Sequence, residues 1–238
     1  LLESQERLDA QAIANPARLQ EFQREFQTIL LNVEAGELAL LKKYNHSIVA
    51  AWMVASKMEG VDEAKLTERY EVLGEEAQAT FYGKRIVDEL NKMQKIAVGA
   101  VAPDFSAPLA DGGVLALHET RAKVKIVNFW ASWSKPCRDE NVNLLRLYKR
   151  YRPKGLEIIS VSLDDNKSVW LTAIGEDGSD WKNVSDMRGP NSVIVVNYQV
   201  KTLPCTFILD DENRIVAKNL RGKELEKKID EMLKKKNK

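Results

Sequence analysis

Residues 127–137 read Val-Asn-Phe-Trp-Ala-Ser-Trp-Ser-Lys-Pro-Cys, and this stretch decides the fold because it joins a strand to a helix. The run of residues 124–129 is short and mostly apolar, which is typical of a largely buried strand. Residues 141–151 repeat apolar side chains at helical spacing, and residues 156–163 form a second candidate strand. A strand, a helix and a strand at this spacing predict a βαβ unit with a parallel strand pair and a right-handed crossover.

The segments downstream of this unit predict a hairpin and a final helix. Residues 206–210 and 214–217 flank a short polar turn, which indicates a β-hairpin. Residues 224–233 are amphipathic and predict a helix that closes the chain. Residues 192–200 are ambiguous, because the run Val-Ile-Val-Val at 193–196 favours a strand on propensity alone.

The first ~95 residues are helical in pattern throughout. Pro16 suits the first turn of a helix, Gly36 is expected to interrupt that helix, and residues 60–62 form a turn signal. Residues 63–93 then predict one further amphipathic stretch.

The composition changes near Val98, where glycines and prolines cluster and β-branched residues follow. We therefore expect two parts: a helical region at 1–96 and an α/β domain at 97–238.

The bulk composition excludes several classes of function. The chain has 238 residues, 44% hydrophobic and 30% charged, with a formal net charge of +1, as in a soluble globular protein. Such a balance gives no reason to expect nucleic acid or an anionic membrane as partner, and no segment is apolar enough to cross a bilayer. The absence of an initiating Met and of a leader suggests a mature or trimmed product.

Cysteine and histidine are too few for a metal centre. Cys137 and Cys205 cannot form a four-ligand zinc site by themselves, and His46 and His118 are distant in sequence. We therefore expect neither a metal nor a cofactor.

Cys137 is the first candidate for chemistry. It follows a strand and falls in the opening turn of the next helix, where unpaired backbone N–H groups and the helix dipole stabilise a thiolate. Since the thiolate is the nucleophilic form, this placement favours reactivity. The alternative is a buried, inert structural cysteine.

Several separated motifs, in order, resemble the TlpA/ResA-like branch of the thioredoxin superfamily, the thiol-disulfide oxidoreductases of bacterial cell envelopes. The matching motifs are Ala-Pro-Asp-Phe at 102–105, Val-Asn-Phe-Trp-Ala-Ser-Trp at 127–133, Pro-Cys-Arg at 136–138 with Glu140, Leu-Pro at 203–204, and Ala-Lys-Asn-Leu-Arg-Gly at 217–222. The resemblance covers a little over half of the chain. It implies an α/β, thioredoxin-like fold, a central mixed sheet flanked by helices, preceded here by an all-α segment. It also implies a helix at 192–200, against propensity.

The resemblance also implies a function and a set of site residues. Family members act on protein thiols and disulfides in the cell envelope or periplasm, with a thiol-disulfide electron donor. In that pattern Cys137 is the resolving cysteine, Glu140 assists proton transfer, and Pro204 is a cis-proline facing the active-site helix. The implied substrate-binding residues are Trp133, Lys135, Pro136 and Leu203.

Ser134 departs from the family pattern, because the first cysteine of the Cys-x-x-Cys motif belongs at this position. A serine hydroxyl stays protonated near neutral pH and cannot exchange with a disulfide. Three explanations remain open: an engineered Cys→Ser change, a natural variant that pairs Cys137 with another partner, or a domain that has lost redox chemistry and kept a binding role. In each case this chain is not expected to form and reduce a disulfide between residues 134 and 137, so it is expected to be inactive or trapped.

Cys205 directly follows Pro204 and is a possible second thiol. The resemblance brings it near Cys137, so a Cys137–Cys205 bridge is one alternative. The other is that Cys205 faces the core, since successive strand residues point to opposite faces of a sheet. A Cα separation beyond ~7 Å would exclude the bridge without backbone movement.

Two further functions compete with the oxidoreductase. Peroxiredoxins place Thr or Ser three residues before the peroxidatic cysteine, as Ser134 and Cys137 are spaced here, but their motif also has a proline where this chain has Trp130. The second alternative is a redox-inactive binding module that holds an extended segment near Trp133 and Pro204.

Overall fold

The computed structural model describes residues 16–235 of the chain. The chain divides into two compact units, Leu1–Leu90 and Asn91–Lys238, and the division falls within helix α6. The boundary expected at 96/97 lies just beyond this division and stays a prediction. None of the helices within the described range combines the length and the hydropathy of a membrane span.

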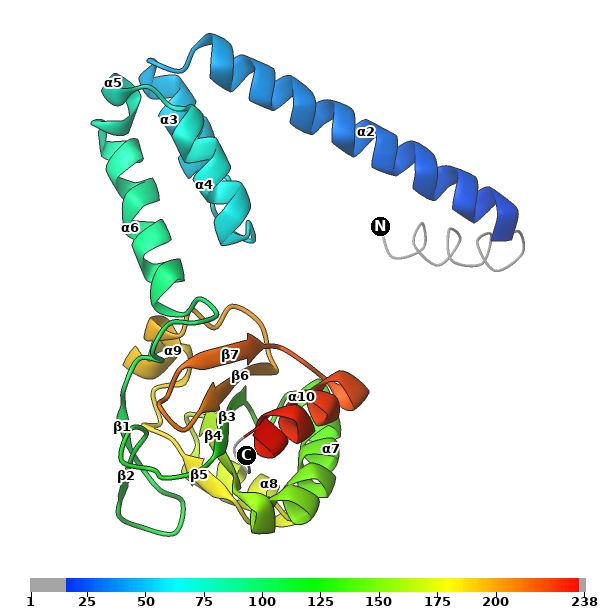
Figure 1. Ribbon diagram of the computed structural model, residues 1–238, viewed down its shortest axis with the longest axis vertical. Helices are drawn as coiled ribbons and strands as arrows, with labels where there is room; N and C mark the ends of the chain where they lie inside the picture. The colour runs from blue at the N-terminus through cyan, green and yellow to red at the C-terminus, as the bar shows by residue number, and fades with distance from the viewer. Residues whose placement is uncertain (1–15, 236–238) are drawn as a thin grey trace. The chain divides into compact units, whose positions relative to one another are not determined.

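The N-terminal unit is built only from helices within its described residues, as the sequence predicts (Figure 1). Its helices are α2 (Pro16–Lys43), α3 (Ile48–Ala55), α4 (Glu63–Val72), α5 (Glu75–Gln78) and α6 (Phe81–Lys95). The expected turn at 60–62 precedes α4, whose first turn is capped by the Asp62 carboxylate 2.8 Å from the backbone nitrogen of Lys65. The stretch at 63–93, predicted as one amphipathic segment, forms three helices. Helix α4 ends where Leu73 takes an extended conformation, Gly74 is the N-cap of α5, and a short break at residues 79–80 precedes α6.

The expected interruption at Gly36 is wrong, since α2 continues through it. A glycine inside a helix costs about 1 kcal/mol relative to alanine, and this helix tolerates that cost. Glu34 forms an ion pair with Lys65 of α4, and Glu37 forms one with Lys57 after α3.

The second unit is built on a five-stranded mixed sheet with the order β5-β4-β3-β6-β7. Its strands are β3 (Val124–Trp130), β4 (Leu156–Ser162), β5 (Lys182–Val184), β6 (Cys205–Asp210) and β7 (Ile215–Lys218); β1 (Ser106–Pro108) and β2 (Val114–Ala116) form a separate antiparallel pair. The predicted parallel pair is β3 with β4, and the predicted hairpin is β6 with β7. The predicted α/β, thioredoxin-like fold is therefore confirmed.

Helices cover both faces of this sheet (Figure 1). Helix α7 (Lys135–Tyr151) and helix α10 (Gly222–Lys235) pack on one face, where Leu144 and Ile229 join Ile126 and Ile208 in a fully buried cluster. The crossover from β4 continues through α8 (Lys167–Asp177), which lies against α7. Two short 3₁₀ helices, at Arg152–Lys154 and Gly189–Asn191, complete the connections.

The opposite face is covered by the short helix α9 (Val193–Asn197), so the strand propensity of residues 192–200 is misleading and the helix implied by the resemblance is confirmed. Ser192 caps the helix, its hydroxyl accepting from the backbone nitrogen of Ile194 at 3.2 Å. Ile194 and Val195 are buried against the sheet. Capping and packing outweigh the preference of β-branched residues for strands.

A single segment, residues 99–110, covers both edges of the sheet. Along β7, the backbone nitrogen of Gly99 donates to Ile215 and that of Ala102 donates to Asn213, at 2.7 and 2.8 Å. Along β5, the backbone nitrogen of Ala110 donates to Asn183 at 2.9 Å, next to an antiparallel bridge between Leu109 and Val184.

Candidate active site

Cys137 lies in the opening turn of α7, directly after the loop that leaves β3. Pro136 occupies the same turn, where its missing N–H costs nothing. The thiol is 0% exposed and packs in a small cluster with Trp130 and with Trp170 and Ala173 of α8. The sequence therefore placed the sulfur correctly along the chain, and the structure adds that it is closed off from solvent.

Burial raises the pKa of the Cys137 thiol. Hydrogen bonding by Ser134 and by the Ala131 backbone, together with the Arg221 guanidinium, lowers the pKa only in part, and Asp164 raises it. Desolvation of the buried thiol thus opposes the activation expected from the helix N-terminus.

Ser134 is the N-cap residue of α7, but its side chain makes no capping hydrogen bond. The residue is 8% exposed, so it is slightly more accessible than Cys137. Its contact with the Cys137 thiol brings together the two positions that a Cys-x-x-Cys motif would use.

The Leu203–Pro204 peptide bond is cis, as the resemblance implies. Leu203 packs against the cluster that contains Cys137. The loop before β6 therefore lies next to the start of α7, and the structure brings Cys137, Ser134 and this loop together.

Arg221 links this loop to the active-site helix, a role that the sequence analysis did not assign. Its Nη2 donates to the carbonyl oxygen of Pro204 at 2.6 Å, and its Nη1 lies 3.6 Å from Oε1 of Glu140. Glu140 is buried and also accepts from the Asn143 side chain at 3.2 Å. The carboxylate expected to move protons is therefore held in an ion pair with Arg221. Only the position of Arg221 in the last matching motif hinted at it.

Asp164 fixes the loop before α7 through hydrogen bonds from Ser132. Its buried carboxylate accepts from the Ser132 backbone nitrogen at 3.0 Å, from the Ser132 hydroxyl at 2.5 Å and from the Ser162 hydroxyl at 2.6 Å. Since Asp164 is 30 residues from Ser134 in sequence, local patterns gave no signal for it. These bonds hold the loop in one geometry beside the thiol.

Arg138 joins the active-site helix to α8. Its Nε donates to both carboxylate oxygens of Asp177, at 2.7 and 2.8 Å, and its Nη2 donates to Glu176 at 2.9 Å. Asn141 donates to the same Asp177 carboxylate at 2.7 Å. The first two turns of α7 are therefore fixed on the α8 side as well.

The surface beside the thiol is formed by Trp133, Lys135 and Pro136, which are all exposed. The Trp133 side chain is 69% exposed, and Lys135 pairs with Asp139 one turn along α7 at 2.9 Å. Trp133 borders a depression of about 460 Å³ that continues along the start of α8 past Val169. Trp133, Lys135 and Pro136 thus lie on an open surface, Leu203 and Pro204 are half-buried, and Cys137, Ser134 and Glu140 lie beneath it.

Cys205 lies on the other face of the sheet. It packs in the cluster that contains Phe129, Phe207 and Tyr198, whereas Cys137 packs on the α7 side. Both cysteines are free, and burial raises the pKa of Cys205 to about 11. The packing supports the core-facing alternative for Cys205.

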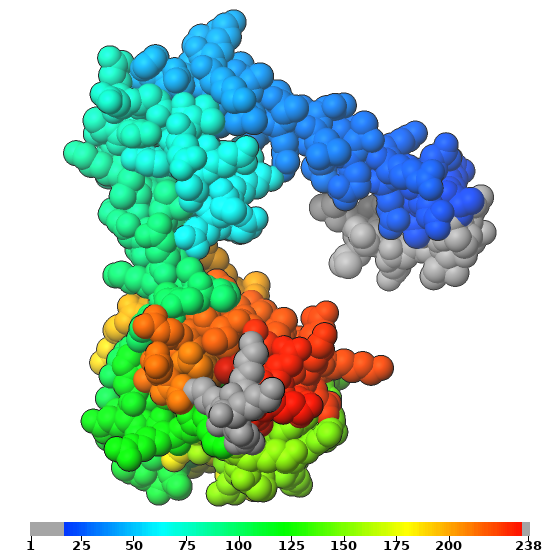
Figure 2. All heavy atoms as spheres, viewed as in Figure 1, coloured from blue at the N-terminus to red at the C-terminus, as the bar shows by residue number. Residues whose placement is uncertain are grey.

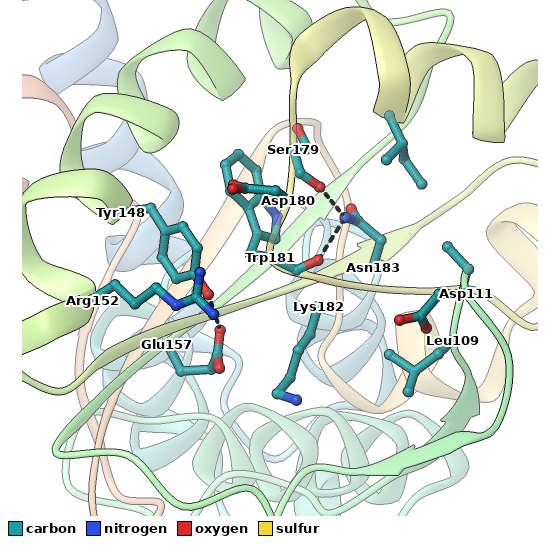
Figure 3. A pocket seen from close by; sticks show the side chains of 12 residues that line it. Leu109, Asp111, Tyr148, Arg152, Glu157, Ser179, Asp180, Trp181, Lys182 and Asn183 are labelled. Carbon is teal, nitrogen blue, oxygen red and sulfur yellow. Dashed lines mark hydrogen bonds between the residues drawn. The ribbon is translucent and has the colours of Figure 1, made fainter.

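A second depression, of about 360 Å³, lies along β5 (Figure 3). The Tyr148 hydroxyl donates to Glu157 at 3.0 Å, and the Asn183 side chain donates to the carbonyl oxygens of Ser179 and Trp181. None of the predicted site residues lines it. In the described part of the chain, no group of three or more His, Cys, Asp or Glu side chains is arranged to hold a metal ion.

Comparison with known proteins identifies the family. The model of the AhpC/TSA family matches residues 98–218, just over half of the chain. The chain belongs to the AhpC/TSA family. The match begins where the composition changes and ends with β7, so it covers the sheet and the site of this AhpC/TSA protein.

Relatives of this AhpC/TSA protein confirm the TlpA/ResA-like resemblance. It is 28% identical over 145 residues to the thiol-disulfide oxidoreductase ResA of Bacillus cereus, and the aligned region covers 61% of this chain and 82% of that protein. It is 34% identical over 139 residues to the thiol:disulfide interchange protein HelX of Rhodobacter capsulatus, and that aligned region covers 57% of this chain and 70% of HelX. Among solved structures, the thioredoxin domain of a thiol-disulfide oxidoreductase from Bacteroides vulgatus is similar, with a TM-score of 0.55, 31% identity and coverage of 58% and 98%.

Proposed function

We propose that the second unit is a thiol-disulfide oxidoreductase domain that acts on protein thiols and disulfides, and that residue 134 decides whether it completes the reaction. One observation carries the proposal: the Cys137 sulfur lies in the opening turn of α7, in contact with Ser134 and with the cluster that Leu203 joins before cis-Pro204. The names of the relatives support the reaction class.

The chemistry follows from the two positions. With a cysteine at 134, its thiolate would attack a substrate disulfide and form a mixed disulfide, and one substrate sulfur would leave as a thiolate. Cys137 would then lose its proton and attack the sulfur of residue 134. The products are a 134–137 disulfide and a fully reduced substrate. With Ser134 the first step is absent, so this chain does not turn over.

The test is the Ser134→Cys variant, assayed for reduction of insulin disulfides by dithiothreitol. We expect turnover in the variant and none above background in the unchanged chain. Ser134→Ala is the matched control and should stay inactive. In the Ser134→Cys/Cys137→Ala double variant, mixed disulfides should accumulate without turnover. A Ser134→Cys protein that folds and shows no exchange would refute the proposal.

The residue roles extend the same proposal. Glu140 is the proton-transfer residue, positioned by Arg221, and Pro204 with Leu203 forms the wall against which an extended substrate segment lies. Trp133, Lys135 and Pro136 form the exposed edge of that surface. Cys205 takes no part in exchange. The partners are protein thiols or disulfides and a thiol-disulfide electron donor, and the location is the cell envelope or periplasm. Support comes from the geometry and from the relatives' names.

Binding without chemistry is the second candidate, favoured by the contrast between the buried Cys137 and the exposed Trp133. In that case the unchanged chain retains a reduced, unfolded protein, and Cys137→Ala does not weaken binding whereas Trp133→Ala does. A peroxidase has less support, because the Cys137 sulfur is fully buried and burial raises its pKa. Rapid sulfenic acid formation at Cys137 with dilute peroxide would favour it instead.

A further inference from the structure

Helix α2 carries a row of large apolar side chains that the described residues of the N-terminal unit, 16–90, leave largely exposed. We call this row the α2 stripe; its members are Leu19, Phe22, Phe26, Ile29, Val33 and Leu40, each between 38% and 63% exposed. In Figure 2 no other coloured part of the N-terminal unit lies over the N-terminal half of α2, in dark blue, on the face that is seen. A contiguous apolar row of this length on a soluble protein marks an interaction surface.

The unit itself holds α2 through other residues. Leu41 is buried and Leu38 is half-buried. Near them, Glu34 and Glu37 form ion pairs with Lys65 and Lys57. The α2 stripe is therefore not part of the packing that fixes the helix at its C-terminal end.

The spacing of the α2 stripe identifies its occupant. From Leu19 to Val33 the intervals are three, four, three and four residues, which is the a/d repeat of a coiled coil, and Leu40 continues it one heptad later. Gly36 occupies the d position between them. Because such a seam is complementary to itself, we propose that the α2 stripe pairs with the α2 stripe of a second copy of this chain, as a parallel two-stranded coiled coil.

The flanking charges are compatible with this pairing. In a parallel, in-register pair each g residue faces the next e residue of the other copy. Arg18 then faces Gln23, and Glu25 faces Leu30. No like charges oppose each other at these positions. An antiparallel pair centred near Phe26 would instead bring the two Glu25 side chains together.

The area is sufficient for a dimer. Taking about 200 Å² for each phenylalanine as an upper value for all six half-exposed members, the α2 stripe presents up to about 600 Å² per copy. A pair therefore removes up to about 1,200 Å² from water, which is the lower end of stable, specific protein interfaces.

The first experiment measures the mass of the whole chain by sedimentation, over a range of protein concentrations up to ~100 µM. We expect a dimer that dissociates on dilution. The Phe22→Glu/Phe26→Glu variant should raise the dimer dissociation constant at least ~100-fold, because it places charges in the seam. Gln20→Glu/Gln27→Glu adds the same charge outside the seam and should leave the dimer intact. Circular dichroism checks that helix content is unchanged.

The second experiment tests the register by disulfide cross-linking. Phe26→Cys and Val33→Cys should each cross-link to itself under mild oxidation, because parallel copies bring equal positions together; Gln27→Cys should not. The native Cys137 and Cys205 are buried and do not compete.

A monomeric wild-type chain, or a dimer unaffected by the Phe22→Glu/Phe26→Glu change, would overturn the inference. So would a monomer that dimerises only after residues 1–15 are removed, or a monomer that binds phosphatidylcholine vesicles through the α2 stripe. Those outcomes assign the stripe to the preceding segment or to a lipid surface.

Discussion

The buried Cys205 thiol should make the stability of the second unit fall at alkaline pH. In the folded chain burial raises its pKa from the ordinary value of 9.0 to about 11. The experiment raises the pH and compares the unfolding free energy of the wild-type chain with that of the Cys205→Ala variant. The variant has no thiol to ionise at this position.

The sign follows from the two pKa values. Below the unfolded-state pKa both states keep the proton, so the stabilising contribution is fully present. As the pH rises toward about 11, the unfolded chain loses the proton first, and unfolding becomes more favourable. A difference of two pKa units corresponds to about 3 kcal/mol of unfolding free energy. The loss therefore develops between about pH 9 and pH 11.

The assay is urea unfolding followed by tryptophan fluorescence, since Trp130, Trp170 and Trp181 are buried in this unit. Loss of the sulfur changes the unfolding free energy of the variant by a constant amount at every pH. The informative quantity is therefore how the difference in unfolding free energy between the two proteins changes with pH. Cys137 is present in both and cancels. A difference that stays constant from about pH 8 to pH 11 would refute the reasoning, because the thiol would then ionise equally easily in both states.

Three further changes test the contacts that hold the site, each by urea unfolding at neutral pH. Asp164→Ala should cost about 3 kcal/mol, because the two Ser132 donors and a neighbouring hydroxyl lose their buried acceptor; a cost below ~1 kcal/mol would contradict this role. Arg221→Met should cost about 2 kcal/mol through the lost bond to Pro204, and in the Ser134→Cys background it should shift the pH profile of exchange; an unchanged profile would argue against a positioning role. Tyr198→Phe should cost about 1 kcal/mol, since its hydroxyl donates to a backbone carbonyl 2.7 Å away; an equally stable variant would show that water replaces the bond.

The sheet was predictable because its strands are short apolar runs with a clear period and clear ends. Residues 124–129 and 156–163 predicted β3 and β4 to within a residue or two. Propensity failed at residues 193–196, where tertiary burial and the Ser192 cap decide the conformation. It failed again at Gly36, where α2 continues although glycine is a poor helix former.

The candidate site was predictable only in the part that is contiguous in sequence. Ser134 and Cys137 share one turn, so their proximity follows from helix geometry. Asp164 and Arg221 reach the site from segments far along the chain, and no local pattern reports such contacts. The direction of the Cys137 pKa was also beyond the sequence, because it depends on how completely α8 covers the thiol.

The segment at 99–110 pairs with the outer edge of β5 and with the beginning of β7 at Ile215. Exposed strand edges are templates for pairing with other chains, so this covering protects the unit against self-association through strand addition. The same segment directly follows the helical region and precedes the site. Trimming the domain past residue 102 would therefore uncover the rim along β7, and we expect such a shortened protein to form β-rich aggregates while its helices stay intact.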